Sequence, residues 1–376
     1  MNIIELLTFA HQSGASDVHL GAGEPPRLRV SGNMRKLDHP ALSSEEVHRS
    51  IFDVIPQTLR QRFQETNDVD FAFELGDIVR FRVNVFRQRK GEGAVFRLIP
   101  SHVLTLEELG LPPILKEIAD KERGLVLVTG PTGSGKSTTL AAMVNHINEH
   151  FDGHILTIED PIEFVHASKR SLITQREVGP HTVSFASALR AALREDPDVV
   201  LVGEMRDLET ISLALTAAET GHLVFATLHT SSAPKTVDRI IDVFPAAQQE
   251  HIRIMFGESI EAVITQTLLR KRGGGRVAAL EILVGTPAVR NLIREKKGHQ
   301  LPSAMQTGQS VGMQTLDMAL RDLIRRDLVS PEEAQSRTLT PNLIGSLRSE
   351  STRDTAPTRP RSTPRSPRGF DTGGGQ

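Results

Sequence analysis

The stretch Gly130-Pro131-Thr132-Gly133-Ser134-Gly135-Lys136-Ser137 decides the fold that this sequence predicts. It fits the phosphate-loop pattern G-x-x-x-x-G-K-[ST] and follows the apolar run 125–128, as that pattern requires. The glycines let backbone N–H groups surround phosphates, and the positive end of a following helix adds to the attraction. We therefore expect residues 130–138, through Thr138, to bind nucleotide, with Lys136 on the β- and γ-phosphates and Ser137 on Mg²⁺.

Composition narrows the class of protein. The 376 residues leave room for two domains, and 44 Lys and Arg nearly balance 46 Asp and Glu, so no basic field covers the whole protein. The chain has no cysteine, which excludes disulfides and thiolate metal sites. Its first residues are acidic, unlike a secretion signal, and no apolar run approaches the roughly 18 residues of a spanning helix. These features predict a cytoplasmic protein.

Hydrophobic patterning predicts two domains of different type. Residues 1–98 read as a small α+β domain without a catalytic motif, in which 79–86 alternates strictly between apolar and polar. Residues 99–112 form the candidate linker. Residues 113–346 alternate buried strands with amphipathic helices, which predicts an α/β domain with a mainly parallel sheet. The segment 347–376 is basic and poor in apolar side chains, which predicts a disordered tail; its arginines motivate the hypothesis of weak attraction to an anionic membrane surface.

Individual elements follow from the same patterns. The apolar runs predict strands at 125–128, 155–158, 199–202, 223–228 and 277–284. Helices are expected at 3–13, 43–54, 246–270, 286–295 and 313–327, and another between Asp207 as its cap and Gly221.

Carboxylates follow two of the expected strands. Strand 155–158 runs into Glu159 and, four residues later, Glu163, whereas strand 199–202 runs into Gly203-Glu204. Phosphate-loop enzymes hold Mg²⁺ and the attacking water with acidic groups at such strand ends. We expect Glu159 and Glu204 on the metal side and Glu163 or Glu204 as the group that orients water.

Histidines and arginines offer weaker signals. His222 and His229 flank strand 223–228 and are seven residues apart, so on an extended strand they face opposite ways and cannot both chelate one metal. A γ-phosphate sensor or a relay to a moving interface suits such a pair better. Arginines of a neighbouring domain or subunit can stabilise charge in phosphoryl transfer. No spacing rule selects among the candidates, which are Arg82, Arg97, Arg190, Arg194 and Arg206.

Several motifs in this order resemble the secretion ATPases of the type II and type IV pilus class. The matching segments are the phosphate loop, the "Asp box" 157–163, an atypical Walker B at 200–207, the "His box" 220–230 and the segment Ala288-Val289-Arg290-Asn291-Leu292-Ile293-Arg294, which resembles the AIRNLIRE motif of the retraction members. The segments 299–301 and 305–308 also match, and the resemblance spans about 1–345.

This resemblance implies a RecA-like core behind a PAS-like N-terminal domain, in a homohexamer that binds ATP and Mg²⁺. It implies Lys136 and Ser137 on nucleotide and metal, Glu163 as base, Glu204 on the metal side, and Arg82 and Arg97 reaching the nucleotide. Assembly members resemble one another in a four-cysteine zinc motif, which this chain lacks. The implied function is therefore pilus retraction and twitching motility, at an inner-membrane platform protein on its cytoplasmic face, with only peripheral membrane association.

Three alternatives remain open. The chain could be an assembly motor or an accessory retraction paralogue, which only genetics separates. A RecA-like nucleic-acid motor is disfavoured by the near-neutral charge and the absence of Tyr and Trp for base stacking, so no DNA or RNA partner is expected. A scaffold that binds nucleotide without turnover is the third. The direction of rotation and the conformational cycle do not follow from the sequence.

Overall fold

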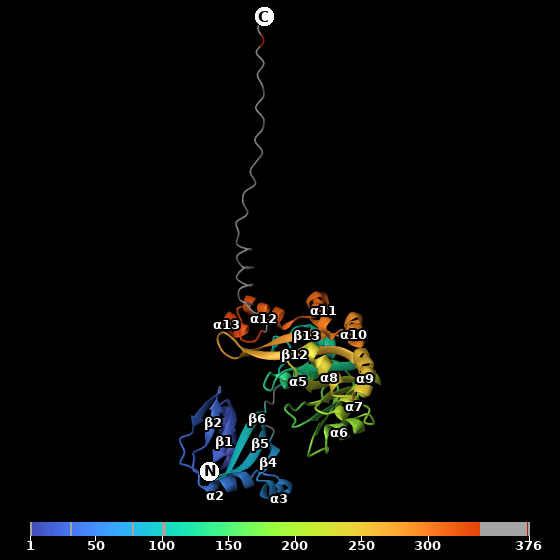
Figure 1. Ribbon diagram of the computed structural model, residues 1–376. Helices are drawn as coiled ribbons and strands as arrows, with labels where there is room; N and C mark the ends of the chain where they lie inside the picture. Colours follow the sequence, from blue (N-terminus) through green and yellow to red (C-terminus); the bar gives the residue numbers. More distant parts are fainter. Residues whose placement is uncertain (1, 31, 77–78, 100–102, 339–373, 375–376) are drawn as a thin grey trace.

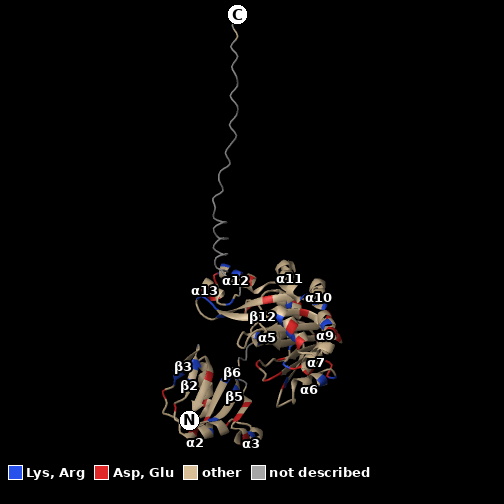
Figure 2. Cartoon of the chain, viewed as in Figure 1, with Lys and Arg blue, Asp and Glu red and all other residues tan. Residues whose placement is uncertain are grey.

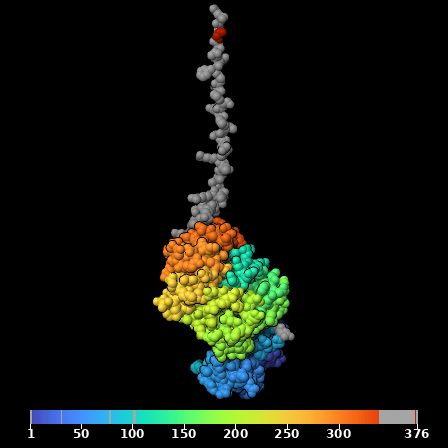
Figure 3. Space-filling model, turned by 90° about the vertical axis from the view of Figure 1, so that its right-hand side faces the viewer, coloured from blue at the N-terminus to red at the C-terminus, as the bar shows by residue number. Residues whose placement is uncertain are grey.

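The computed structural model describes residues 2–30, 32–76, 79–99, 103–338 and 374. The predicted tail, apart from Gly374, and residues 100–102 of the predicted linker lie outside these ranges. Two sheets organise the described residues, one in each half of the chain (Figure 1). In Figure 3 the blue N-terminal part and the green to orange remainder are two lobes of one molecule.

The N-terminal sheet is antiparallel throughout, with strand order β3-β2-β1-β6-β5-β4. Its strands are β1 Ala15–Gly21, β2 Arg27–Val30, β3 Asn33–Lys36, β4 Asp68–Leu75, β5 Val79–Gln88 and β6 Gly91–Ile99. Three helices, α1 Ile3–Gln12, α2 Ser44–Phe52 and α3 Gln57–Thr66, share an apolar core with it. The predicted helix at 43–54 is confirmed, and Ser43 caps it in a capping box with Glu46.

The second sheet is parallel except at one edge, with strand order β13-β12-β7-β11-β10-β8-β9. Its strands are β7 Gly124–Thr129, β8 His154–Glu159, β9 Leu172–Glu177, β10 Val199–Val202, β11 Leu223–Leu228, β12 Ile260–Arg270 and β13 Arg276–Val284. The five strands expected from apolar runs are confirmed. An α/β fold with an N-terminal antiparallel sheet and a mixed, mainly parallel core is thus established.

Helices cover both faces of this second sheet, which explains the continuous apolar runs of its strands. In β7, Leu125 and Leu127 belong to one apolar cluster, and Val126 and Val128 to another on the opposite face. The helices are α4 Ile114–Ala119, α5 Lys136–His150, α6 Phe185–Ala192, α7 Leu208–Glu219, α8 Ala233–Asp242, α9 Ala246–Ser259, α10 Pro287–Arg294, α11 Leu301–Thr307, α12 Leu316–Arg325 and α13 Pro331–Gln335. Asp207 caps α7 as predicted, because its side chain accepts a hydrogen bond from the Thr210 N–H.

The single helix predicted at 246–270 is wrong. Helix α9 ends at Ser259, and residues 260–270 form β12, which lies between β7 and β13. The stretch is rich in β-branched residues, and pairing on both sides satisfies its backbone, which outweighs the helical continuation of α9. Consequently a strand borders the phosphate-loop strand on the side away from β11.

Charges of both signs are mixed over both halves of the described chain, as the near-neutral net charge requires (Figure 2). Among the described residues, none of the helices is long and apolar enough to cross a membrane.

Candidate active site

The phosphate loop connects β7 to α5 in a conformation that only glycine tolerates at several positions. Gly130, Gly133 and Gly135 have φ of 139°, 77° and 87°. A Cβ on Gly130 would also lie 2.3 Å from the Gln266 carbonyl oxygen. The predicted role of these glycines therefore rests on a backbone shape and a close approach that side chains would prevent.

Lys136 opens α5 and folds back over the loop. Its Nζ donates to the carbonyl oxygens of Gly130, at 2.9 Å, and Pro131, at 3.3 Å. Burial lowers the pKa of Lys136, and the negative charges of Glu204 and Glu163 oppose that shift. Both carboxylates thus lie close enough to Lys136 for their charges to act on it.

Parallel strands explain why these distant residues meet. The carboxyl ends of β7, β8, β10 and β11 lie at one edge of the sheet, and the phosphate loop, Glu163, Glu204 and His229 all follow these ends. His229 Nε2 lies 3.1 Å from Glu204 Oε1. The structure therefore brings the predicted phosphate loop together with three further predicted site residues, Glu163, Glu204 and His229.

Glu204 is held by two cationic or basic side chains. Arg206 approaches both carboxylate oxygens, with Nε 2.7 Å from Oε1 and Nη2 2.7 Å from Oε2, in addition to His229. Burial raises the pKa of Glu204, but the contacts of Arg206 and His229 outweigh it and hold the pKa below its ordinary value. Glu204 is therefore an ionised carboxylate in this site.

Glu159 is placed differently from its predicted metal role. Its Oε1 accepts hydrogen bonds from Thr157 Oγ1, at 2.7 Å, and Gln175 Nε2, at 3.3 Å, while Oε2 accepts from the Glu163 N–H at 3.4 Å. Burial raises the pKa of Glu159, which disfavours the charged form that a magnesium ligand needs. In this structure Glu159 supports the loop that carries Glu163, and its predicted contact with Mg²⁺, directly or through water, stays a prediction.

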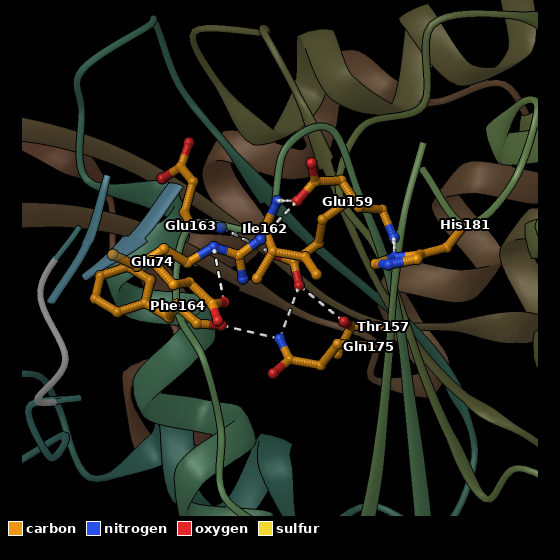
Figure 4. A network of polar contacts seen from close by, with 10 residues as sticks. Glu74, Thr157, Glu159, Ile162, Glu163, Phe164, Gln175 and His181 are labelled. Carbon is orange, nitrogen blue, oxygen red and sulfur yellow. Dashed lines mark hydrogen bonds and ion pairs between the residues drawn. The ribbon is translucent and has the colours of Figure 1, made fainter. Parts of the chain in front are cut away.

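That loop, residues 160–166, is fastened to β8 and β9 by side chains at several points (Figure 4). Gln175 donates to the Phe164 carbonyl at 2.9 Å and accepts from the His166 N–H at 2.9 Å. In Figure 4 the carboxylate of Glu163 points away from these contacts, and the residue is exposed. The loop is fixed while its acidic side chain stays available.

His222, also a predicted site residue, does not join this group. His222 precedes β11, and its Nδ1 donates a hydrogen bond to the Ala217 carbonyl oxygen at 2.9 Å. A six-residue strand separates it from His229, about 20 Å at the usual rise. The sensor role does not fit this position, because strand β11 puts His222 at the opposite edge; the relay role stays a prediction.

Arg194 lies just beyond the end of α6, exposed, with Nη1 3.3 Å from the Arg190 carbonyl oxygen. Strand β10 begins five residues later, at the sheet edge opposite the phosphate loop. Arg194 is therefore remote from the site of its own chain, and a contribution from a neighbouring subunit stays a prediction.

Arg82 and Arg97 face each other across β5 and β6. Arg97 Nε donates to Asp17 Oδ1 at 2.8 Å, and Arg82 Nε lies 3.9 Å from Asp70 Oδ1. Burial raises the pKa of Asp17, but the hydrogen bonds from Arg97 and Ser16 hold it below its ordinary value. Arg97 is thus hydrogen-bonded within the N-terminal sheet, whereas Arg82 makes only a long ion pair there, and the reach of both to nucleotide stays a prediction.

The residues present fit a magnesium ion. The Ser137 hydroxyl, in the first turn of α5, and the ionised Glu204 are hard oxygen donors at the same sheet edge. No group of three His, Asp or Glu side chains arranged to hold a metal by themselves occurs in the described ranges.

The sequence matches the family model "Type II/IV secretion system protein" over residues 2–274. The type IV pilus retraction ATPase PilT of Pseudomonas aeruginosa is 59% identical over 341 residues, which cover 91% of this chain and 99% of that protein. This chain belongs to the type II/IV secretion system protein family. A twitching motility protein of Neisseria gonorrhoeae is 61% identical over 313 residues, 83% of this chain and 84% of that protein.

Solved structures agree with this membership. A crystal structure of the pilus retraction motor PilT with bound ADP superimposes with a TM-score of 0.86 at 48% identity, covering 91% of this chain and 98% of that one. The resemblance to retraction members is confirmed, and the chain is a nucleotide-binding ATPase of this secretion family.

Gln266 is a site residue that the sequence patterns do not predict, because they favour a helix over residues 246–270. It lies on β12, buried, behind the phosphate loop. Its Nε2 donates to the Ser134 carbonyl at 2.8 Å, and its Oε1 accepts from Thr139 Oγ1 at 2.7 Å. One carboxamide thus joins the loop to the first turns of α5. The only sequence signal for this role is the group of three polar residues, Thr265-Gln266-Thr267, inside an otherwise apolar run.

We expect Gln266→Leu to weaken nucleotide binding about tenfold. The substitution leaves two buried polar groups without partners, a cost of about 1–3 kcal/mol, and lets the loop depart from its bound shape. Fluorescent ADP titration measures the effect. Thr139→Val removes one of the same hydrogen bonds and should act in the same direction, whereas Thr139→Ser keeps the hydroxyl. Wild-type affinity in a folded Gln266→Leu variant would contradict the role.

Proposed function

We propose that this protein is the motor ATPase of type IV pilus retraction, which hydrolyses ATP to withdraw pilin subunits at the base of the fibre and so drives twitching motility. The observation that carries the proposal is the 59% identity to a pilus retraction ATPase over 99% of that protein's length. The phosphate loop, the two acidic loops and His229 supply the chemistry at one edge of the sheet.

The site supports in-line hydrolysis of the γ-phosphate. The backbone of residues 130–138 and the Lys136 ammonium bind the phosphates, and Glu163 takes the proton of a water whose oxygen attacks the γ-phosphorus. The bond from the γ-phosphorus to the bridging oxygen breaks, which releases ADP and phosphate. Ser137 and Glu204 would hold Mg²⁺, which neutralises charge on the phosphate oxygens.

Other residues respond to the state of the nucleotide. His229 contacts Glu204 at 3.1 Å, so a change at the γ-phosphate can pass to β11 through this pair. Arg82 and Arg97 would approach the nucleotide when the N-terminal lobe closes, and Arg194 would act on the site of a neighbouring subunit. His222 would relay movement at the far edge of the sheet.

The proposed assembly is a homohexamer built from a RecA-like core, residues 113–346, and a PAS-like domain, residues 1–98, joined by the linker 99–112. Successive hydrolysis around the ring would turn closure of these domains into motion of an inner-membrane platform protein. The proposed location is the cytoplasmic face of that membrane, with peripheral association only.

Deletion of the gene tests the biological assignment. We expect cells with more surface pili and no twitching motility, because fibres still assemble but are not withdrawn. Electron microscopy of pili and a surface-spreading assay provide the measurement, with the wild-type gene restored as the control. A strain without pili would instead identify an assembly motor, and normal twitching would indicate an accessory paralogue.

A further inference from the structure

An ion pair joins the N-terminal sheet to strand β9 of the other lobe. Arg80 of β5 donates from Nη2 to Glu177 Oε2 at 3.1 Å. Glu177 is the last residue of β9, in the other lobe. Both side chains are largely shielded from water, 15% and 6% exposed respectively. This contact is therefore a buried charge pair between the lobes, unlike the exposed pairs elsewhere on the surface.

The same oxygen of Glu177 also holds the loop 160–166. Oε2 accepts a second hydrogen bond, from the Ile162 N–H at 3.1 Å, and Ile162 directly precedes Glu163. The backbone of Glu177 is itself fixed, because its N–H donates to His181 Nδ1 at 3.0 Å. Figure 4 shows Ile162, Glu163 and His181 around this point. One carboxylate oxygen thus lies between an arginine of one lobe and the backbone beside the proposed base.

Sequence alternation explains why Arg80 reaches this far. Val79 and Phe81 point into the core of the N-terminal lobe, so Arg80 is on the other face of β5, together with Arg82. Arg80 also lies 3.8 Å, through Nε, from Glu74 Oε1 of the neighbouring β4. Its Nε is buried and has no hydrogen-bond partner. The guanidinium therefore makes its main contact with Glu177, and its contact with Glu74 is longer and weaker.

We propose that Glu177 is a positioning residue through which Arg80 lets the placement of the N-terminal lobe set the position of Glu163. With Arg80 in contact, the charge of the carboxylate is balanced by the guanidinium, and Oε2 stays fixed against the Ile162 N–H. When the lobes separate, a buried carboxylate loses its cation, which costs far more than an exposed pair would. Glu177 then turns toward water, and residues 160–163 lose one of their fastenings.

Turnover is consequently coupled to lobe closure. Glu159 and Gln175 still hold the loop at Glu163 and Phe164, so it shifts and does not unfold. A shift of about 1 Å at a catalytic group can slow chemistry up to about a hundredfold. Glu177 makes none of the phosphate-loop contacts described above. We therefore expect loss of the Arg80–Glu177 pair to leave nucleotide affinity unchanged. This inference rests on Glu163 being the base.

The test compares Arg80→Gln and Glu177→Gln with the wild-type chain. Each should lower kcat about tenfold while the Kd for a fluorescent ADP analogue stays within twofold. The double variant should be no slower than the slower single one, because both changes break one path. Arg80→Lys should recover part of the rate. Arg49→Gln, which removes an exposed pair on α2 of the same lobe, serves as the matched control and should be unchanged.

Hydrogen–deuterium exchange supplies a readout that does not depend on turnover. Arg80→Gln should speed exchange in a peptide covering 160–166, in the other lobe, while a peptide from β10 exchanges as before. Unchanged kcat and unchanged exchange in both single variants would overturn the proposal, as would effects that multiply in the double variant. If Glu163→Gln itself keeps full turnover, the assignment of the base fails instead, whatever Arg80 does.

Discussion

Replacing Lys136 by alanine should lower ATP turnover by about 100- to 1,000-fold. This is the range for removing one group that stabilises charge in the transition state. The ammonium is held over the loop by the carbonyls of Gly130 and Pro131 and is partly buried. Burial has already removed part of its hydration, which strengthens its attraction to phosphate oxygens. The variant loses affinity and rate together.

Phosphate release and fluorescent ADP titration measure the two effects of this change. Lys297→Ala is the matched control, because that lysine pairs only with Glu295 at the surface in the described contacts and should leave both quantities unchanged. A Lys136→Ala protein that folds and hydrolyses ATP at the wild-type rate would remove the enzymatic role of the phosphate loop.

Replacing Glu163 by glutamine should lower kcat by about 100- to 10,000-fold, the usual contribution of a general base, while nucleotide affinity is retained. The amide keeps the shape of the side chain but cannot accept the proton of water. The surrounding loop should be undisturbed, because its fastenings use the Ile162 and Glu163 N–H groups and the Phe164 carbonyl, not the Glu163 carboxylate.

Glu204→Gln distinguishes the two glutamates. Glu204 is ionised and bound by Arg206 and His229, so its loss should raise the Mg²⁺ concentration that half-maximal activity requires. Glu163→Gln should leave that concentration unchanged. Titrating Mg²⁺ against turnover in both variants assigns the roles, and the reverse pattern would exchange them.

The local sequence determined the phosphate loop, because the residues that bind phosphate are consecutive in the chain. The spacing from Gly130 to Ser137 fixes the backbone shape, and unbroken apolar runs fix strands that are buried on both faces. Given parallel strands, the convergence of the loop with Glu163, Glu204 and His229 follows from where their strands end. The motifs also sufficed to recognise the family, since they occur in a fixed order.

Only the tertiary structure decided which side chains complete the site. Residues 260–270 carry no local feature strong enough to end a helix, and they form a strand because β7 and β13 offer hydrogen bonds on both sides. Gln266 enters the site for that reason. Likewise, Glu159 faces inward and Arg80 meets Glu177 across 97 positions of sequence. Such contacts depend on burial and on the packing of elements that are distant in sequence. The free energy that stabilises them comes from these long-range contacts, so no short stretch of sequence predicts them.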